Sequence, residues 1–243
     1  MRTFILGVPF DTYTFKEALD VLSSYLEQDD TPVRAHACFT PNPEMVMAAR
    51  KDAAFMAVLN EADLVVPDGI GIVIASRLKG RMIKERVSGC DLTQALFENI
   101  KSQGKSVYLL GGKPGVNEKA KAHIEQMYAG LTVAGFHHGY FDDKDEISIV
   151  TEIQACKPDI LLVGLGFPRQ EKWIAANKDK LPVKVAMGIG GTLDVLAGTV
   201  KRAPVVYQKL GLEWLYRLAK QPSRLRRAVQ LPLFMIRAIL SKR

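Results

Sequence analysis

A chain of 243 residues with 48% hydrophobic and 24% charged residues can bury a substantial core and lies within the ordinary globular range. Its three cysteines, Cys38, Cys90 and Cys156, are widely spaced, which argues against a disulfide framework or a cysteine zinc site and favours a reducing compartment. No apolar stretch approaches the roughly 18–20 residues of a membrane-spanning helix, and the N-terminus lacks a signal peptide pattern. We therefore expect a cytoplasmic protein.

The net charge of +7 is concentrated at the C-terminus. Residues 202–243 carry ten lysines and arginines and a single acid, Glu213, whereas residues 1–201 carry slightly more acidic than basic residues. Such asymmetry indicates a nucleic-acid or anionic-membrane partner for the basic segment and not for the rest of the chain. We expect two domains: a core over residues 1–201 and a basic helical appendage over residues 202–243.

Apolar strand-like runs alternate with helical runs as far as about residue 201. Strands are expected at residues 2–6, 33–39, 64–66, 106–110, 131–136, 159–165 and 184–187, with helices between them. Nearly continuous apolar strands of this kind are typical of a parallel sheet that is covered on both faces. The predicted fold class is therefore α/β, a Rossmann-like, mostly parallel sheet flanked by helices.

Polar side chains follow two of these strands at their carboxyl ends. Thr40 and Asn42 come after the second predicted strand, Asp68 comes after the third, and Arg86 lies close behind in sequence. In open α/β sheets, ligands bind beyond the carboxyl ends of the strands. A carboxylate at such a place has the geometry of a general base, although Asp68 could equally cap the helix that follows it. The sequence thus predicts a site here and leaves both roles of Asp68 open.

Three glycine-rich turns follow later strands. Backbone N–H groups and helix N-termini at such turns bind phosphate, so three in one sheet favour nucleotide or phosphate binding. None fits GxGxxG followed by an acid about 20 residues on, so a dinucleotide site is not expected. Asp194 is a further candidate for the nucleotide end, or else an internal helix cap. The turns are Gly111-Gly112, Gly164-Leu165-Gly166 and Gly188-Ile189-Gly190-Gly191.

No metal or cofactor is expected. Asp143-Lys144-Asp145 superficially matches the DxD motif of many sugar transferases, but it lies in an acidic loop without a flanking apolar strand. We interpret it as the start of a helix. The four histidines have neither HExxH nor another ligand spacing.

The basic segment is predicted to form two helices. The first, over residues 205–219, has Leu210, Trp214 and Leu218 on one face, and the second, over residues 223–240, is interrupted by Pro232. Basic amphipathic helices with Trp, Phe and Leu lie in the membrane interface, where each basic residue adds on the order of 1 kcal/mol. We expect peripheral attachment to an anionic membrane. Packing on a partner subunit, in a homo-oligomer, stays open; nucleic acid is not expected, since no binding module is visible.

Six motifs in chain order resemble the bacterial glycosyltransferase family 26. They are TPNPEMVMAARKD, ADLVVPDGIGIVIASRL, KERVSGCDL, LLGGKPGV, GLGFPRQEKW and GIGGTLDVLAG, and the similarity runs from about Gly7 to Arg227. The resemblance implies transfer of N-acetylmannosamine from UDP-N-acetylmannosamine to the C4 hydroxyl of GlcNAc-diphospho-undecaprenol, with inversion and without a metal. Such an enzyme of wall teichoic acid linkage-unit synthesis would work at the inner face of the cell membrane.

The resemblance also implies roles for individual residues. Asp68 matches the family's proposed base. The C-terminal appendage of the family is held to touch the membrane and to complete the active site with arginines. Arginine and backbone N–H donors would balance the charge of the leaving UDP. Other matching active-site positions are Thr40, Asn42, Arg86 and Gln170, and the matching appendage positions are Arg217, Arg224 and Arg227.

Two other functions stay open. One keeps the fold and the base but uses another donor, such as UDP-N-acetylmannosaminuronic acid or UDP-glucose, in surface polysaccharide synthesis. The other is a nucleotide-binding regulatory protein whose basic tail contacts RNA.

Overall fold

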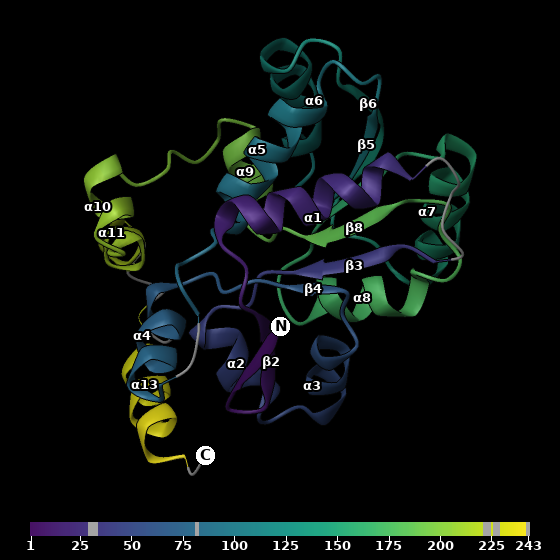
Figure 1. Cartoon of the computed structure of the whole chain (residues 1–243). Coiled ribbons are helices and arrows are strands. Elements are labelled where there is room, and N and C mark those ends of the chain that lie inside the picture. The colour runs from purple at the N-terminus through teal and green to yellow at the C-terminus, as the bar shows by residue number, and fades with distance from the viewer. Residues whose placement is uncertain (29–33, 81–82, 221–224, 226–228, 242–243) are drawn as a thin grey trace.

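The computed structural model describes residues 1–28, 34–80, 83–220, 225 and 229–241, without the side chains of Lys209 and Arg217 (Figure 1). A six-stranded sheet with the order β4-β3-β8-β7-β5-β6 forms its centre, and every neighbouring pair in it is parallel. The predicted α/β class is confirmed. The strands of this sheet are β3 (His36–Phe39), β4 (Leu64–Val65), β5 (Ser106–Gly111), β6 (Thr132–His137), β7 (Ile160–Gly164) and β8 (Val185–Gly188).

Helices cover both faces of the sheet (Figure 1). Along each strand successive side chains point to opposite faces, so Leu162 and Met187 join one apolar cluster while Val163 and Ala186 join the other. The first cluster includes side chains of α1 (Phe15–Glu27), α5 (Gly89–Ile100), α6 (Val116–Met127) and α9 (Thr192–Leu196). The second includes side chains of α2 (Pro43–Ala49), α3 (Ala53–Asn60), α4 (Ile70–Leu78), α7 (Asp143–Cys156) and α8 (Arg169–Asn177).

The N-terminus forms an antiparallel hairpin, β1 (Arg2–Ile5) and β2 (Val8–Asp11), whose second strand the sequence analysis missed. Its two-residue turn has φ +53 at Leu6 and +89 at Gly7. Hairpin turns of this kind favour Asn-Gly or Asp-Gly, and leucine rarely adopts a positive φ, so the turn signal was weak. The Asp11 carboxylate accepts from Arg2 and from the backbone N–H of Val65, which ties the hairpin to the edge strand β4.

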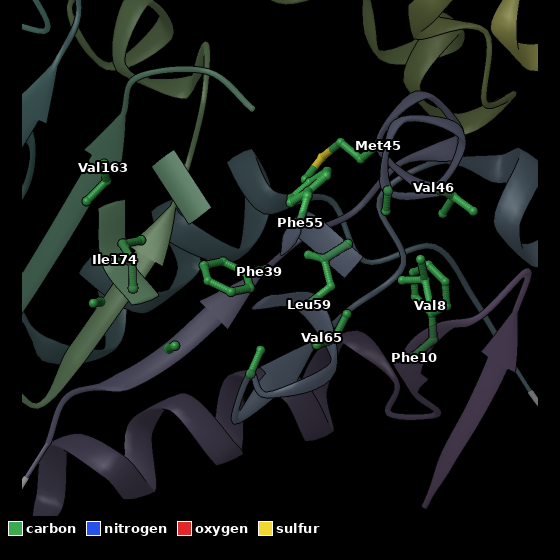
Figure 2. Packing of buried hydrophobic residues seen from close by; sticks show 14 of the residues in the cluster. Val8, Phe10, Phe39, Met45, Val46, Phe55, Leu59, Val65, Val163 and Ile174 are labelled. Atoms are coloured by element: carbon green, nitrogen blue, oxygen red, sulfur yellow. The ribbon is translucent and has the colours of Figure 1, made fainter. Parts of the chain in front are cut away.

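An apolar cluster around Phe39 holds this part of the fold together (Figure 2). Phe39 is fully buried together with Phe55 of α3, and Val8 and Phe10 of the hairpin extend the same cluster. Met45 of α2 belongs to it as well. This packing fixes the orientation of α2, which begins directly after the polar turn at the end of β3.

Helix starts follow the sequence closely. Thr14 and Glu17 form the reciprocal capping box at the start of α1. Asp142 caps α7, and Asp143 and Asp145 lie in its first turn, which confirms their interpretation as a helix start. Among the described residues, the three cysteines form no disulfide bond.

The described part of the tail contains α10 (Val205–Lys209), α11 (Glu213–Lys220) and α13 (Gln230–Leu240). The predicted continuous helix over residues 205–219 is wrong: it is broken at Gly211, where φ is +70 and a Cβ atom would lie 2.9 Å from Ile70 Cβ. The predicted interruption at Pro232 is also wrong. Pro232 lies in the first turn of α13, where a missing N–H costs no helical hydrogen bond.

Helix α13 packs against α2 and α4 of the core (Figure 1). Phe234 and Ala238 are buried in this contact, and Gly71 of α4 allows it, since a Cβ there would lie 2.9 Å from Leu231 Cδ1. Within the described ranges, no helix has the length and apolarity that crossing a membrane requires. The tail is thus joined to the core by a buried contact at its far end.

Candidate active site

A cavity of about 370 Å³ lies beyond the carboxyl ends of β3, β4, β7 and β8. Its core wall comes from the loops that follow these strands, and its outer wall comes from the tail through Glu213, Trp214 and Leu218 of α11 and Leu231 of α13. Residues that were predicted from separate motifs line this one space. They are Thr40, Asn42, Asp68, Arg86, Gly166 and Gln170.

Asp68 is held between a helix N-terminus and an arginine. Its Oδ2 lies 3.3 Å from the backbone N of Gly89, at the start of α5, and its Oδ1 lies 3.3 Å from Arg86 Nε. A helix N-terminus favours a negative charge, and the side chain is 31% exposed toward the cavity that it lines. Helix α4 is capped by Gly69 without a side-chain hydrogen bond. The interpretation of Asp68 as the cap of that helix is therefore wrong.

Thr40 and Asn42 reach the cavity from the end of β3. Asn42 caps α2: its Oδ1 accepts from Met45 N at 3.0 Å, which leaves its NH₂ group as the part that can donate to a ligand. Thr40 packs against the start of α5, where a Cβ on Gly89 would lie 2.8 Å from Thr40 Oγ1. Glycine at position 89 therefore lets the two elements meet beside Asp68.

Arg86 joins the core side of the cavity to the tail. Its Nε faces Asp68, and its Nη2 donates to Glu213 Oε2 of α11 at 3.0 Å. Burial by itself would lower the pKa of Arg86, but the carboxylates of Asp68 and Glu213 outweigh burial and raise it. Arg86 is therefore a fixed cation at the wall of the cavity, of the type that binds phosphate.

Gln170 lies at the start of α8, and its amide binds two neighbouring groups. Its Oε1 accepts from Gly190 N at 3.0 Å, and its Nε2 donates to Glu171 Oε1 at 2.7 Å. A Cβ on Gly188 would lie 2.8 Å from Gln170 Nε2, so glycine lets β8 end this close to α8. The Gln170 side chain thus fixes the turn after β8, which forms part of the cavity wall.

Glu171 is a buried carboxyl group that sequence reasoning missed. Its side chain is fully buried, and its Oε2 has no hydrogen-bond partner among the described residues. Burial, opposed in part by the hydrogen bond from Gln170, raises the pKa of Glu171 to about 7. Nothing in the pattern PRQEKW separates this glutamate from a solvent-exposed charge near a helix start.

The predicted nucleotide residues at the other strand ends lie apart from this cavity. Gly111, with φ +134, faces β7 so closely that a Cβ would lie 2.4 Å from Gly164 O. A Cβ on Gly112 would lie 3.1 Å from Leu193 Cδ2, and Asp194 lies in the first turn of α9. None of Gly111, Gly112 and Asp194 lines the cavity described here. Their contact with a nucleotide stays a prediction.

The side chains of the three predicted tail arginines lie outside what the structure describes. Arg224 and Arg227 lie outside the described residues, and of Arg217 only the backbone, within α11, is described. A different tail arginine is placed: the Arg202 guanidinium binds the Asp91 carboxylate and lies 3.7 Å from Glu213 Oε2. Sequence reasoning had counted Arg202 and Glu213 only as charges.

In the part of the chain that the structure describes, no three His, Cys, Asp or Glu side chains are grouped so that they could hold a metal ion. At the cavity, Arg86 forms ion pairs with Asp68 and Glu213, and Asp68 also accepts from the backbone N–H of Gly89.

Comparison with known proteins identifies the family of the chain. Residues 3–243 match the family model described as the glycosyl transferase WecG/TagA/CpsF family. Over 239 residues, 98% of this chain and 92% of the relative, the sequence is 36% identical to an N-acetylglucosaminyldiphosphoundecaprenol N-acetyl-beta-D-mannosaminyltransferase of Staphylococcus aureus strain MRSA252. It is 35% identical, with the same coverage, to the protein of that name from strain MW2. The resemblance drawn from the six motifs is confirmed, and the chain is a glycosyltransferase that belongs to the WecG/TagA/CpsF family.

Proposed function

We propose that the protein transfers N-acetylmannosamine from UDP-N-acetylmannosamine to GlcNAc-diphospho-undecaprenol, forming a β-1,4 linkage in the synthesis of the wall teichoic acid linkage unit. The names of the relatives give the donor sugar and the acceptor. The observation that carries the proposal for this chain is the cavity in which Asp68 and Arg86 lie side by side, with Thr40, Asn42 and Gln170 in the same walls.

The proposed step is a single displacement with inversion and without a metal. Asp68 removes the proton of the acceptor C4 hydroxyl, the oxygen attacks C1 of the donor sugar, and UDP leaves with the electrons of the broken C1–O bond. A carboxylate beside a cavity supports the base role. Arg86 and the backbone N–H groups of the turn after β8 are the donors toward the diphosphate. Asn42 contacts the sugar or its acetamido group through its free NH₂, and Gln170 acts by fixing the turn or by contacting the sugar.

The tail, residues 202–243, is proposed to be the domain that holds the enzyme on the inner face of the membrane. Large apolar side chains among its described residues are exposed, among them Val206 at 65%, Leu210 at 63% and Leu240 at 75%. Together with the basic composition of the tail, they are the features of a helix that lies in an anionic membrane interface. Because α11 and α13 also line the cavity, attachment there would bring the lipid acceptor to the site.

The test is transfer of radiolabel from UDP-N-acetylmannosamine to a GlcNAc-diphospho-lipid in the presence of EDTA. We expect transfer by the wild type and a loss of roughly 10²–10⁴-fold in Asp68→Ala. Asp143→Asn is the matched control, because it removes an exposed carboxylate of the DxD-like sequence and should keep the full rate. An inactive wild type, a fully active Asp68→Ala or a requirement for a divalent metal would contradict the proposal as stated.

The donor is tested separately. In a panel of UDP-N-acetylmannosamine, UDP-N-acetylmannosaminuronic acid and UDP-glucose, we expect the highest kcat/KM for the first. A higher kcat/KM for either of the other two UDP-sugars would show that the donor assignment is wrong, while the fold and the proposed base would stand.

A further inference from the structure

Five charged side chains of alternating sign connect the proposed base to the tail. In order they are Asp68, Arg86, Glu213, Arg202 and Asp91, and each is in contact with the next or within 4 Å of it. The three central members are the most buried, with side chains 17%, 10% and 14% exposed. Glu213 is the middle member of this series of five side chains, and it is the only acidic residue of the tail.

The guanidinium of Arg86 is shared between two carboxylates. The Nε–H and one Nη2–H of a guanidinium point the same way and form a fork that matches the two oxygens of a single carboxylate. Here the fork is divided: Nε faces Asp68 at 3.3 Å, and Nη2 donates to Glu213 at 3.0 Å. Asp68 therefore has only one contact with Arg86, and its second oxygen is bound by Gly89 N.

We propose that Glu213 is a positioning residue, which divides the fork of Arg86 and so keeps Asp68 from a two-point ion pair with that arginine. Without the Glu213 carboxylate, Nη2 would turn to the remaining carboxylate, and both N–H groups would occupy the oxygens of Asp68 that have to accept the acceptor's proton. Arg202 holds Glu213 from its other side. The inference rests on the proposed function in taking Asp68 as the base.

The proposal predicts opposite changes in turnover and in nucleotide binding. Removing Glu213 weakens the base, so kcat should fall. It also removes a negative charge from a cavity that binds the anion UDP, so UDP should bind as tightly as before or more tightly. A role confined to folding would instead weaken binding and lower stability together.

The experiment uses the full chain with Glu213→Ala and Glu213→Gln. We expect kcat to fall at least about tenfold in Glu213→Ala and less in Glu213→Gln, whose amide oxygen still accepts from Nη2, while the Kd of UDP measured by calorimetry is unchanged or lower. Unchanged kcat per folded molecule, or a Kd that rises in parallel with a lower Tm, would overturn the inference.

Asp63→Asn is the matched control. Asp63 is a carboxylate of similar burial, 14% exposed, that accepts from both Nη atoms of Arg34 and from Ala37 N near the amino end of β3. It should lower Tm while leaving kcat and the Kd of UDP as they are.

A crystal structure of Glu213→Ala separates this inference from the proposed function. We expect both Nε and Nη2 of Arg86 on the two oxygens of Asp68, and this readout does not depend on which sugar is transferred. Arg86 retained in its single contact with Asp68 would overturn the inference, even if the wild type proves to be the proposed transferase. Conversely, a wild type inactive with UDP-N-acetylmannosamine would leave the arrangement of Arg86 to be judged by the structure alone.

Discussion

The core over residues 1–201 and the tail over residues 202–243 use charged and apolar side chains in opposite ways. In the core, apolar side chains are buried in two clusters on either side of the sheet, and the overall charge is close to neutral. In the tail, most large apolar side chains are exposed, and the excess charge is strongly positive. Yet Glu213, the one acidic residue of the tail, lines the cavity together with residues of the core. The difference shows that a segment with the composition of a surface-binding helix also forms part of the wall of the cavity that we propose as the active site.

The largest expected effect tests whether the chemistry belongs to the core. Asp68→Asn keeps the shape of the side chain but removes its basicity, so transfer should fall by roughly 10²–10⁴-fold while the free energy of unfolding changes little. Initial rates with UDP-N-acetylmannosamine, together with urea denaturation, measure both. If the variant retains more than a tenth of the wild-type rate, Asp68 is not the base, and a residue of the tail would be the next candidate.

The next effect tests how firmly the tail is joined to the core. Phe234 of α13 is fully buried against the core, so Phe234→Ala should lower the free energy of unfolding by about 3–5 kcal/mol. Its neighbour Leu233 is 40% exposed, and Leu233→Ala should cost less than about 1 kcal/mol. Urea denaturation of the two variants gives the comparison. Equal and small losses would mean that α13 is not docked on the core in solution.

The buried carboxyl group of Glu171 in the core should make the stability of the protein depend on pH. The pKa of Glu171 is about 7 in the folded protein, against 4.5 for an ordinary glutamate, so between these values the folded state binds more protons than the unfolded state. Its contribution to stability is therefore full below about pH 4.5 and is lost as the pH rises through 7, a change on the order of 3 kcal/mol.

Urea titrations at several pH values between 4.5 and 8 measure this contribution. Glu171→Gln should remove that part of the pH dependence, while Asp143→Asn, an exposed carboxyl, should leave it in place. The same slope in wild type and Glu171→Gln would show that Glu171 is ionised in the folded protein.

Substitutions on the exposed side of α13 should have the smallest effect on stability but a clear effect on membrane binding. Ile236 and Ile239 of α13 are 54% and 57% exposed, so replacing both with serine should change the free energy of unfolding by no more than about 0.5 kcal/mol for each. Co-sedimentation with anionic phospholipid vesicles should nevertheless fall several-fold, since an isoleucine side chain gains up to about 1.5–3 kcal/mol on leaving water.

Ile147→Ser on α7 is the control for this surface, because Ile147 is 72% exposed on a core helix. Binding should be as strong as that of the wild type. An equal loss of vesicle binding in Ile147→Ser would remove the distinction between the tail and the core as membrane-facing surfaces.

The sequence by itself determined the parallel sheet, because apolar strands covered on both faces have to be nearly continuous, and helix caps such as Thr14 and Asp142 act through their nearest neighbours in the chain. It also determined where Thr40, Asn42 and Asp68 meet, because parallel strands end at the same edge of the sheet.

Only the tertiary structure decided the ends and the contacts of the tail. The break at Gly211 depends on the approach of Ile70, which lies 141 positions earlier in the chain. The roles of Glu213 and Arg202 depend on Arg86 and Asp91, to which they are brought by the docking of α11. The raised pKa of Glu171 depends on burial from all sides. Charge pairing and desolvation depend on distances in space, and a sequence pattern does not give the distances between residues that are far apart in the chain.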